Sequence, residues 1–148
     1  MLTAYFAQKA FVLHNDSLLA VRRNAKDPHN PLRWEVPGGR LEAGEELDHH
    51  LIREVREETG ITIIPGEPFY LWKWNIKKKT ADAPDTIVAV ARFCTAQTTE
   101  LDSGGRMDDD DLDLMEWVPL AKLSTMDWIP NTKPVVEAFL ARIEGSRK

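Results

Sequence analysis

Apolar and polar residues alternate along the first part of the chain in a way that predicts strands. Residues 4–13 and 18–22 are two β-prone runs separated by turn formers at 14–17, so we expect two strands joined by a turn. Residues 24–33 carry two prolines among polar residues and are predicted to form a loop. A short extended segment follows, and Pro37-Gly38-Gly39 interrupts it.

The next segment shows helical periodicity instead. Residues Glu45–Thr59 contain neither glycine nor proline, and apolar residues recur at every fourth position, namely Leu47, Leu51 and Val55. This spacing predicts a helix with one apolar stripe. Gly60 follows at a position where helices often end in a left-handed residue, so we expect the helix to end there.

The second half of the chain returns mainly to strand-like patterns. We expect strands at 61–64, 69–76, 86–95 and 112–118, a polar hairpin loop at 77–85 and a final amphipathic helix at 134–143. No repeat, linker or low-complexity tract divides the sequence. The pattern therefore predicts a single domain over residues 1–148, with a mixed sheet and helices on its faces.

Composition narrows the class of protein. At 148 residues, 43% of them hydrophobic, the chain can form one sizeable core, and no apolar run reaches the length of a membrane span. The net charge of -5 argues against a nucleic-acid partner. A small phosphorylated substrate is compatible with this charge if a metal ion supplies positive charge. Cys94, the one cysteine, lies in an apolar run, as expected of a buried thiol in a cytoplasmic protein.

Three glutamates on the predicted first helix suggest chemistry. Glu54, Glu57 and Glu58 stand at relative positions i, i+3 and i+4, and Glu54 and Glu58 project beside the apolar stripe. Like charges held this close repel one another, and burial increases that cost. Carboxylate oxygens suit a hard cation such as Mg²⁺, which also binds substrate phosphates. The alternative is an ordinary charged helix face, neutralised by Arg53 and Arg56.

The surrounding residues decide between these interpretations. Residues 38–61, GGRLEAGEELDHHLIREVREETGI, fit the pattern G-x5-E-x7-R-E-U-x-E-E-x-G-U, where U is a bulky aliphatic residue. The matching residues are Gly39, Glu45, Arg53, Glu54, Val55, Glu57, Glu58, Gly60 and Ile61. A chance match is on the order of 10⁻⁷ at average composition. The pattern is the Nudix box, and the chain resembles the Nudix (MutT-type) family, more loosely also in RWEVPGG before the box and EWVPL after it.

The resemblance implies both a fold and a metal site. The fold would be α/β (α+β), a Nudix-like α/β/α sandwich around a mixed sheet, with the box forming a loop-helix-loop. Glu54, Glu57 and Glu58 would bind Mg²⁺, for which Mn²⁺ can substitute, and the Gly38 carbonyl would often be a further ligand. The expected activity is hydrolysis of a phosphoanhydride bond in a nucleoside diphosphate derivative.

The resemblance also suggests which residues support the carboxylates and which accept a proton. Arg53 would pair with Glu45 and hold the carboxylate array. Water must attack phosphorus in line, and a carboxylate takes its proton. Glu54 or Glu57 is one candidate for this base. Glu116 is the other, because family members often carry a further acidic residue just before this strand end, although a solvated carboxylate is equally compatible with the sequence.

Contacts to the substrate are less strongly indicated. Arg22 and Arg23 end the second strand and resemble basic residues that contact nucleotide in MutT-type members, although exposed arginine pairs are common. Tyr70, Trp72 and Trp74 alternate along one strand and share a face. Trp72 could stack on a base, whereas packing in the core is the more common use of such a face.

His50 lies at one of the undefined positions of the box. It occupies a helix position that is usually alanine in the family, at an angle between Glu54 and Glu57. The sequence favours a partly exposed structural histidine, and the alternative is a role in tuning the metal site or in contacting a leaving phosphate.

The sequence is compatible with three functions. The leading one is a nucleoside triphosphate pyrophosphohydrolase that releases nucleoside monophosphate and pyrophosphate. An ADP-ribose or nucleotide-sugar pyrophosphatase is the alternative, which the absence of a subfamily marker after the box disfavours. A non-catalytic module that senses a nucleotide would normally have an eroded box, and this box is intact. We expect a cytoplasmic monomer or homodimer that binds a small nucleotide, not nucleic acid or a membrane.

Overall fold

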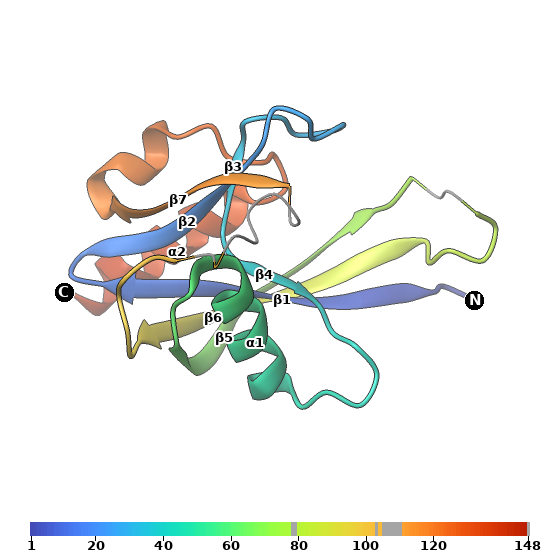
Figure 1. The fold of residues 1–148 in the computed structure, drawn as a ribbon, viewed down its shortest axis with the longest axis horizontal. Coiled ribbons are helices and arrows are strands. Elements are labelled where there is room, and N and C mark those ends of the chain that lie inside the picture. Colours follow the sequence, from blue (N-terminus) through green and yellow to red (C-terminus); the bar gives the residue numbers. More distant parts are fainter. Residues whose placement is uncertain (78–79, 103, 105–110, 148) are drawn as a thin grey trace.

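The computed structural model describes residues 1–77, 80–102, 104 and 111–147 (Figure 1). The strands are β1 (Ala4–His14), β2 (Ser17–Arg23), β3 (Trp34–Glu35), β4 (Gly38–Arg40), β5 (Ile63–Asn75), β6 (Thr86–Ala96) and β7 (Leu112–Pro119). The helices are α1 (Leu47–Thr59), the 3-10 helix η1 (Leu120–Thr125) and α2 (Lys133–Ser146). No helix among the described residues is long and apolar enough to cross a membrane.

The strands within these residues form one mixed sheet that divides around β1. The sheet has the order β3-β2-β1-β6-β5, while β4 pairs with β1 and β7 pairs with β2. β1 runs parallel to β6 and antiparallel to β2 and β4. Its middle residues, Ala7 to Lys9, pair with β4, and its last residues, Leu13 and His14, pair with β2. Figure 1 shows β2, β3 and β7 on one side of this division and β5 and β6 on the other.

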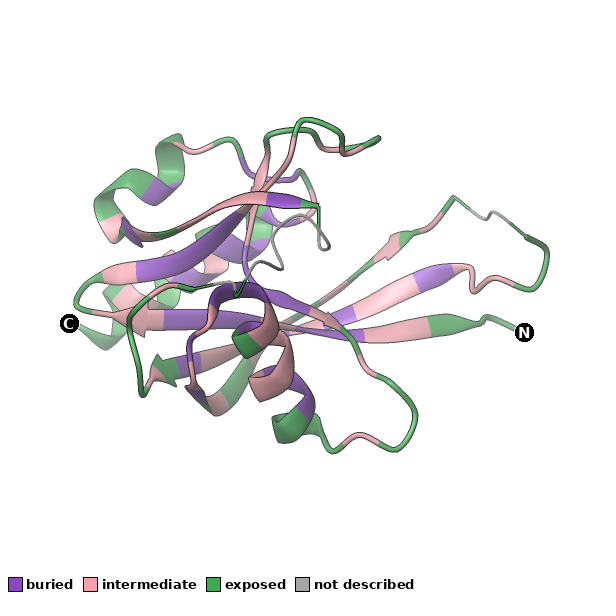
Figure 2. Ribbon diagram, in the orientation of Figure 1, coloured by how far each residue is buried: buried purple, intermediate pink, exposed green. Residues whose placement is uncertain are grey.

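Two clusters of buried side chains hold a helix on each face of the sheet. Phe11 of β1 packs in one cluster with Phe139 of α2. Its neighbour Val12 packs in the other cluster with Leu51 and Val55 of α1. Because neighbouring residues of a strand point to opposite faces, α1 and α2 cover opposite faces of the sheet. This confirms the predicted α/β/α layers, and Figure 2 shows the buried residues concentrated between them.

Helix α1 begins two residues later than the sequence suggested. Leu47 is its first residue, because Glu46 has an extended backbone with φ -75° and ψ 146°, and it therefore lies outside the helix. The expected start at Glu45 was wrong for this reason. The predicted end is confirmed: Gly60 is left-handed, with φ 79°, and its N–H donates to the Arg56 carbonyl.

The sequence predicted two separate strands at 61–64 and 69–76, but the structure has one strand, β5, in their place. β5 runs without interruption from Ile63 to Asn75, although Pro65 and Pro68 lie inside it. The ladder to β6 shifts register between Pro65 and Pro68 and again before Tyr70. β5 is an edge strand, so the prolines need not donate to a second neighbour, and the strand tolerates them. In the predicted hairpin loop at 77–85, residues 78 and 79 lie outside the described part of the chain.

Candidate active site

A polar cavity of about 570 Å³ lies between the elements that meet where the sheet divides. Its walls come from α1, from all seven described strands, from the loop after β2 and from the segment between η1 and α2. Polar and charged lining residues are Lys9, Arg23, Asp27, His29, Asn30, Glu35, Arg40, Glu54, Glu58, Asn131 and Thr132. The cavity has the size of a small-molecule site.

Glu58 places a buried carboxylate in this wall. It is 8% exposed, and it lies on α1 on the side that faces β4. The Gly38 N–H donates to its Oε1 at 3.3 Å. Burial raises the pKa of Glu58 well above its usual range, with Lys9 acting in the opposite direction. The predicted position of Glu58 beside the apolar stripe is therefore confirmed, and burial favours the neutral form of its carboxyl group unless a cation lies nearby.

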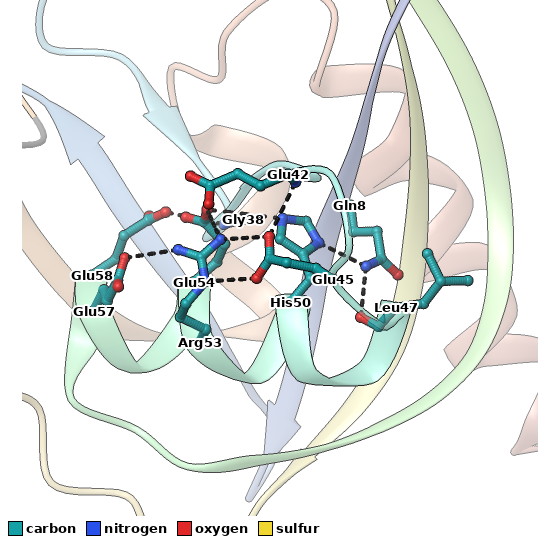
Figure 3. Close-up of polar contacts among 10 residues, drawn as sticks. All are labelled: Gln8, Gly38, Glu42, Glu45, Leu47, His50, Arg53, Glu54, Glu57 and Glu58. Atoms are coloured by element: carbon teal, nitrogen blue, oxygen red, sulfur yellow. Dashed lines mark hydrogen bonds and ion pairs between the residues drawn. The ribbon is translucent and has the colours of Figure 1, made fainter.

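Arg53 connects the glutamates of the box (Figure 3). Its Nε and Nη2 donate to the two oxygens of Glu45, both at 2.8 Å. The same guanidinium lies 3.4 Å from Glu54 Oε1 and 3.2 Å from Glu57 Oε2. The bond to Arg53 lowers the pKa of Glu45 to about 2, and the three carboxylates raise the pKa of Arg53. The structure thus brings Arg53 and Glu45 together as the resemblance implied.

The glycines of the box make room for a carboxylate. A Cβ on Gly39 would lie 2.7 Å from Cδ of Glu54, closer than real Cβ contacts come. A Cβ on Gly38 would lie 2.1 Å from the Gln8 carbonyl oxygen. The backbone neighbour excludes a side chain at Gly38, whereas a side chain at Gly39 would displace the Glu54 carboxyl group from its close approach to β4.

His50 differs from the expectation. Its side chain is fully buried rather than partly exposed, because it points from α1 toward β1. Its Nδ1 lies 2.8 Å from Gln8 Nε2, and its Nε2 lies 3.8 Å from Glu54 Oε1. Burial lowers the pKa of His50, although the charge of Glu45 opposes this shift. The sequence pattern could not show this because Gln8 belongs to a distant strand.

The donor set suits a divalent cation, although no ready-made cage is present. Among the described residues, no three His, Cys, Asp or Glu side chains are gathered tightly enough to hold a metal ion. Arg53 instead engages Glu54 and Glu57. The donors are nevertheless all oxygens, and the Glu58 carboxylate is buried against the cavity. Hard cations such as Mg²⁺ bind to such donors.

The two predicted arginine contacts have different surroundings. Arg23 lines the cavity, where Asp27 pairs with its Nε at 2.8 Å. Arg22 lies outside the cavity lining and makes a two-point contact with Asp113 at 2.9 and 2.8 Å. Arg22 also lies over the ring of Trp34, 5.9 Å from its centroid. The structure thus places Arg23, but not Arg22, in the wall of the site.

The aromatic residues of β5 and the Glu116 side chain differ in whether they reach the cavity. Trp72 packs against the α2-side core cluster, as the more common use of such a face predicts. Trp74, whose ring centroid is 6.1 Å from that of Trp72, is the aromatic residue that lines the cavity. Glu116 is exposed on β7, pairs with Ala20 in the ladder, and is not among the cavity-lining residues.

Several cavity residues were not anticipated. Lys9 is the least expected, with a side chain only 16% exposed and its Nζ 3.4 Å from Glu35 Oε1. A lysine inside the apolar run of β1 is a signal that could have identified it. Asn131 and Thr132, just before α2, carry no such signal in the sequence, because only the packing of α2 brings them to the site.

The fold and the site are those of an α/β enzyme whose cavity is lined by carboxylates. Residues 7–139 match the NUDIX domain, so the chain belongs to the Nudix family and is a hydrolase that acts on pyrophosphate bonds.

Similar proteins agree with this assignment. The 8-oxo-dGTP diphosphatase of Escherichia coli (strain K12) is 27% identical over 125 residues, which cover 84% of this chain and 88% of that protein. The MutT protein of Methanosarcina mazei Go1 has the same fold, with a TM-score of 0.72, 21% identity, and coverage of 99% of this chain and 98% of that chain. An ADP-ribose pyrophosphatase from Streptococcus suis 89-1591 shares the fold with a TM-score of 0.65, 18% identity, and coverage of 97% and 92%.

Proposed function

We propose that this hydrolase is a Mg²⁺-dependent nucleoside triphosphate pyrophosphohydrolase that releases nucleoside monophosphate and pyrophosphate. The cavity is the observation that carries this proposal. It combines the α1 carboxylates Glu54 and Glu58 with groups suited to a nucleotide, namely Arg23, the Trp74 ring and the Asn131 amide. The likeness to the Escherichia coli 8-oxo-dGTP diphosphatase supports a triphosphate, including an oxidised one, as the substrate.

The box residues would hold the cation. Glu54, Glu57 and Glu58, with the Gly38 carbonyl, supply oxygen ligands of the kind that Mg²⁺ prefers. When bound, Mg²⁺ neutralises charge on the phosphoryl oxygens and lowers the pKa of the attacking water. Arg53, through its contact with Glu45, keeps the carboxylates on one side of α1.

The remaining residues have roles in binding and proton transfer. Lys9 and Arg23 add positive charge to the cavity wall and are suited to phosphate oxygens. The Trp74 face can stack on a base with little discrimination between bases. Glu54 or Glu57 accepts the proton of the attacking water, with Glu116 as the other candidate.

A substrate screen tests the substrate. Purified protein is incubated with ordinary and oxidised nucleoside triphosphates, ADP-ribose, other nucleotide sugars and dinucleotides, and the phosphorus products are separated. We expect a triphosphate to have the highest kcat/KM and to release pyrophosphate. If the kcat/KM for ADP-ribose exceeds that of every triphosphate by about tenfold, a difference of about 1.4 kcal/mol in transition-state stabilisation, the nucleotide-sugar alternative replaces this proposal.

A second experiment tests whether activity requires a divalent cation held by the box glutamates. Activity should disappear with EDTA and return with Mg²⁺ or Mn²⁺. Glu57→Gln should reduce turnover by at least ~10²-fold, a typical loss when an electrostatic contribution at a reacting centre is removed. Glu137→Gln, the same change at an exposed residue of α2, is the matched control. Near-normal Mg²⁺-dependent turnover in Glu57→Gln would exclude the proposed ligand set.

A further inference from the structure

A buried imidazole lies directly behind one of the proposed cation ligands (Figure 3). His50 has no exposed surface and lies one helical turn before Glu54. Its Nε2 is 3.8 Å from Glu54 Oε1 and makes no hydrogen bond within the part of the chain that the structure describes. Burying a polar atom without a hydrogen bond costs folding free energy, so the position of this atom calls for an explanation.

The partners of Gln8 determine how this imidazole is protonated. Gln8 is also buried, and its Oε1 accepts a hydrogen bond from Arg92 Nη1 at 3.2 Å. Its Nε2 lies 2.8 Å from the Leu47 carbonyl oxygen and 2.8 Å from His50 Nδ1. A carbonyl oxygen can only accept, so one N–H of the amide goes to Leu47 and the other points to His50.

The orientation of the Gln8 amide is itself fixed from β6. Arg92 Nε donates to the Gly66 carbonyl at 2.9 Å, and its Nη2 pairs with Asp48 at 2.7 Å. Arg92 has no lone pair to offer, so it must face the oxygen of the Gln8 amide. A flipped amide would place two donors against each other. The nitrogen of Gln8 therefore faces His50.

These contacts select one tautomer of His50. Because Nδ1 accepts the N–H of Gln8, the proton of the neutral ring is on Nε2. Nε2 then lies 3.8 Å from Glu54 Oε1, the oxygen that Arg53 Nη2 approaches to 3.4 Å, and the backbone of Arg40 is a further polar group that acts on the ring. Two donors thus lie near one carboxylate oxygen.

We propose that Gln8 and His50 act as positioning residues, which orient the Glu54 carboxylate for the bound cation. The inference rests on the proposed cation site. The orientation is set by the sheet. Arg92 on β6 orients Gln8 on β1, and Gln8 in turn orients His50 on α1. A neutral N–H donor can orient a carboxylate without occupying the place of the cation and without adding a competing charge. Outer groups of this kind set the affinity of a metal site.

Mn²⁺ binding without nucleotide tests the inference apart from turnover. Free Mn²⁺ is measured by electron paramagnetic resonance during titration of the wild type, His50→Leu and His50→Gln. His50→Leu should weaken Mn²⁺ binding by about tenfold, the lower end of typical losses for such outer groups. His50→Gln, which keeps an N–H near Glu54, should recover part of the loss. His49→Leu, the same change at the exposed neighbouring residue, should bind as the wild type does.

The same Mn²⁺ titration on a Gln8 variant tests the contact between β1 and His50. Gln8→Met keeps the length of the side chain and removes its donors, so it should also weaken Mn²⁺ binding. Gln97→Met is the exposed control. Each variant is first compared with the wild type by near-ultraviolet circular dichroism, so that a loss of fold is recognised. Wild-type affinity in folded His50→Leu and Gln8→Met would overturn the inference.

The tautomer is measured directly in the metal-free protein. A long-range ¹H–¹⁵N spectrum, assigned by comparison with His50→Gln, should show His50 protonated at Nε2 only. In Gln8→Glu, where a carboxylate replaces the amide, His50 should carry a proton on Nδ1. An Nδ1–H tautomer in the wild type would overturn the inference. Absence of Mn²⁺ binding by the wild type would instead overturn the proposed cation site as well, so the two failures are distinguishable.

Discussion

Arg53 and Glu45 form a two-point ion pair in which both N–O distances are 2.8 Å. The pair joins the middle of α1 to the loop that precedes it. The Glu45 side chain also accepts the backbone N–H of Glu42 at 3.0 Å, so this loop is closed on itself. Because Arg53 also contacts Glu57, the position of the loop and that of the carboxylates are coupled.

The first prediction concerns the shape of the Arg53 side chain. Arg53→Lys keeps the charge but loses the planar fork that matches the Glu45 carboxylate. We expect kcat/KM to fall by about tenfold or more, the scale of supporting residues at metal sites, with the fold retained. Arg56→Lys, an exposed arginine on the same helix, should have little effect. Equal kinetics in both variants would contradict this role of Arg53.

The same pair predicts how stability depends on pH. The pKa of Glu45 is lowered to about 2 from its usual 4.5, so the folded state binds fewer protons than the unfolded state between these values. Its contribution is therefore present above pH 4.5 and is lost as the pH falls toward 2. In urea unfolding over this range, Glu45→Gln should lose stability less steeply with acidification than the wild type. An unchanged slope would exclude the pair as a source of acid sensitivity.

The contribution of Glu58 to stability should depend on pH in the opposite direction. Burial raises the pKa of its carboxyl, so the folded state holds a proton that the unfolded state releases above about pH 4.5. Metal-free protein should therefore lose stability as the pH rises, and Glu58→Gln should remove this loss and raise the Tm. Each kcal/mol regained corresponds to roughly 3 °C. The variant should also lose the Tm increase that Mg²⁺ gives the wild type. Glu137→Gln is the control, and a lower metal-free Tm in Glu58→Gln would contradict the argument.

The position of Glu116 leads to a prediction about the general base. Glu116 is exposed and lies outside the cavity lining, so Glu116→Gln should change kcat only slightly. Glu54 and Glu57 on α1 would then hold the role. The pH–rate profile provides the measurement, because removing the base removes its acidic limb. A loss of kcat of ~10²-fold with intact Mn²⁺ affinity and no acidic limb would assign the base to Glu116 instead.

The adjacent arginines allow a matched test of substrate binding. Arg23 lines the cavity, and its charge is maintained because Glu35 and Asp27 outweigh the effect of burial, so that its pKa is raised. Arg23→Ala should raise KM for a triphosphate by about tenfold, the scale of a charge-assisted hydrogen bond, with a much smaller change in kcat. Arg22→Ala should leave KM near the wild-type value, because Asp113 engages that side chain. The reverse ranking would place the substrate elsewhere.

The box could be predicted because its geometry is local. A spacing of three and four residues on one helix fixes where Glu54 and Glu58 point relative to Leu51, whatever the rest of the chain does. The structure agrees: the Glu54 side chain is 18% exposed, and the whole Glu58 residue is 8% exposed. The same locality explains why Gly60 could be identified as the helix end.

The rest of the site depends on partners that are distant in sequence. Nothing near Asn131 indicates that it will face α1, and only the return of α2 to the sheet places it there. His50 looks like a polar helix residue until Gln8, more than forty positions earlier, is brought against it. Pro65 reads as the end of a strand unless β5 is known to be an edge. Tertiary neighbours decided each of these cases.

The parallel pairing of β1 with β6 has a consequence for the order in which the protein assembles. Ala4 pairs with Thr86, so a chain segment of roughly eighty residues must be closed before this ladder forms. Helix α1 lies within that segment, and Leu51 and Val55 pack in a cluster that includes Cys94 of β6. During synthesis, the glutamates of the box therefore emerge before β6, and the cluster that holds α1 is incomplete until Cys94 has joined it. The helix that carries the box glutamates therefore reaches its full native packing only after β6 has been synthesised, long after its own residues have emerged.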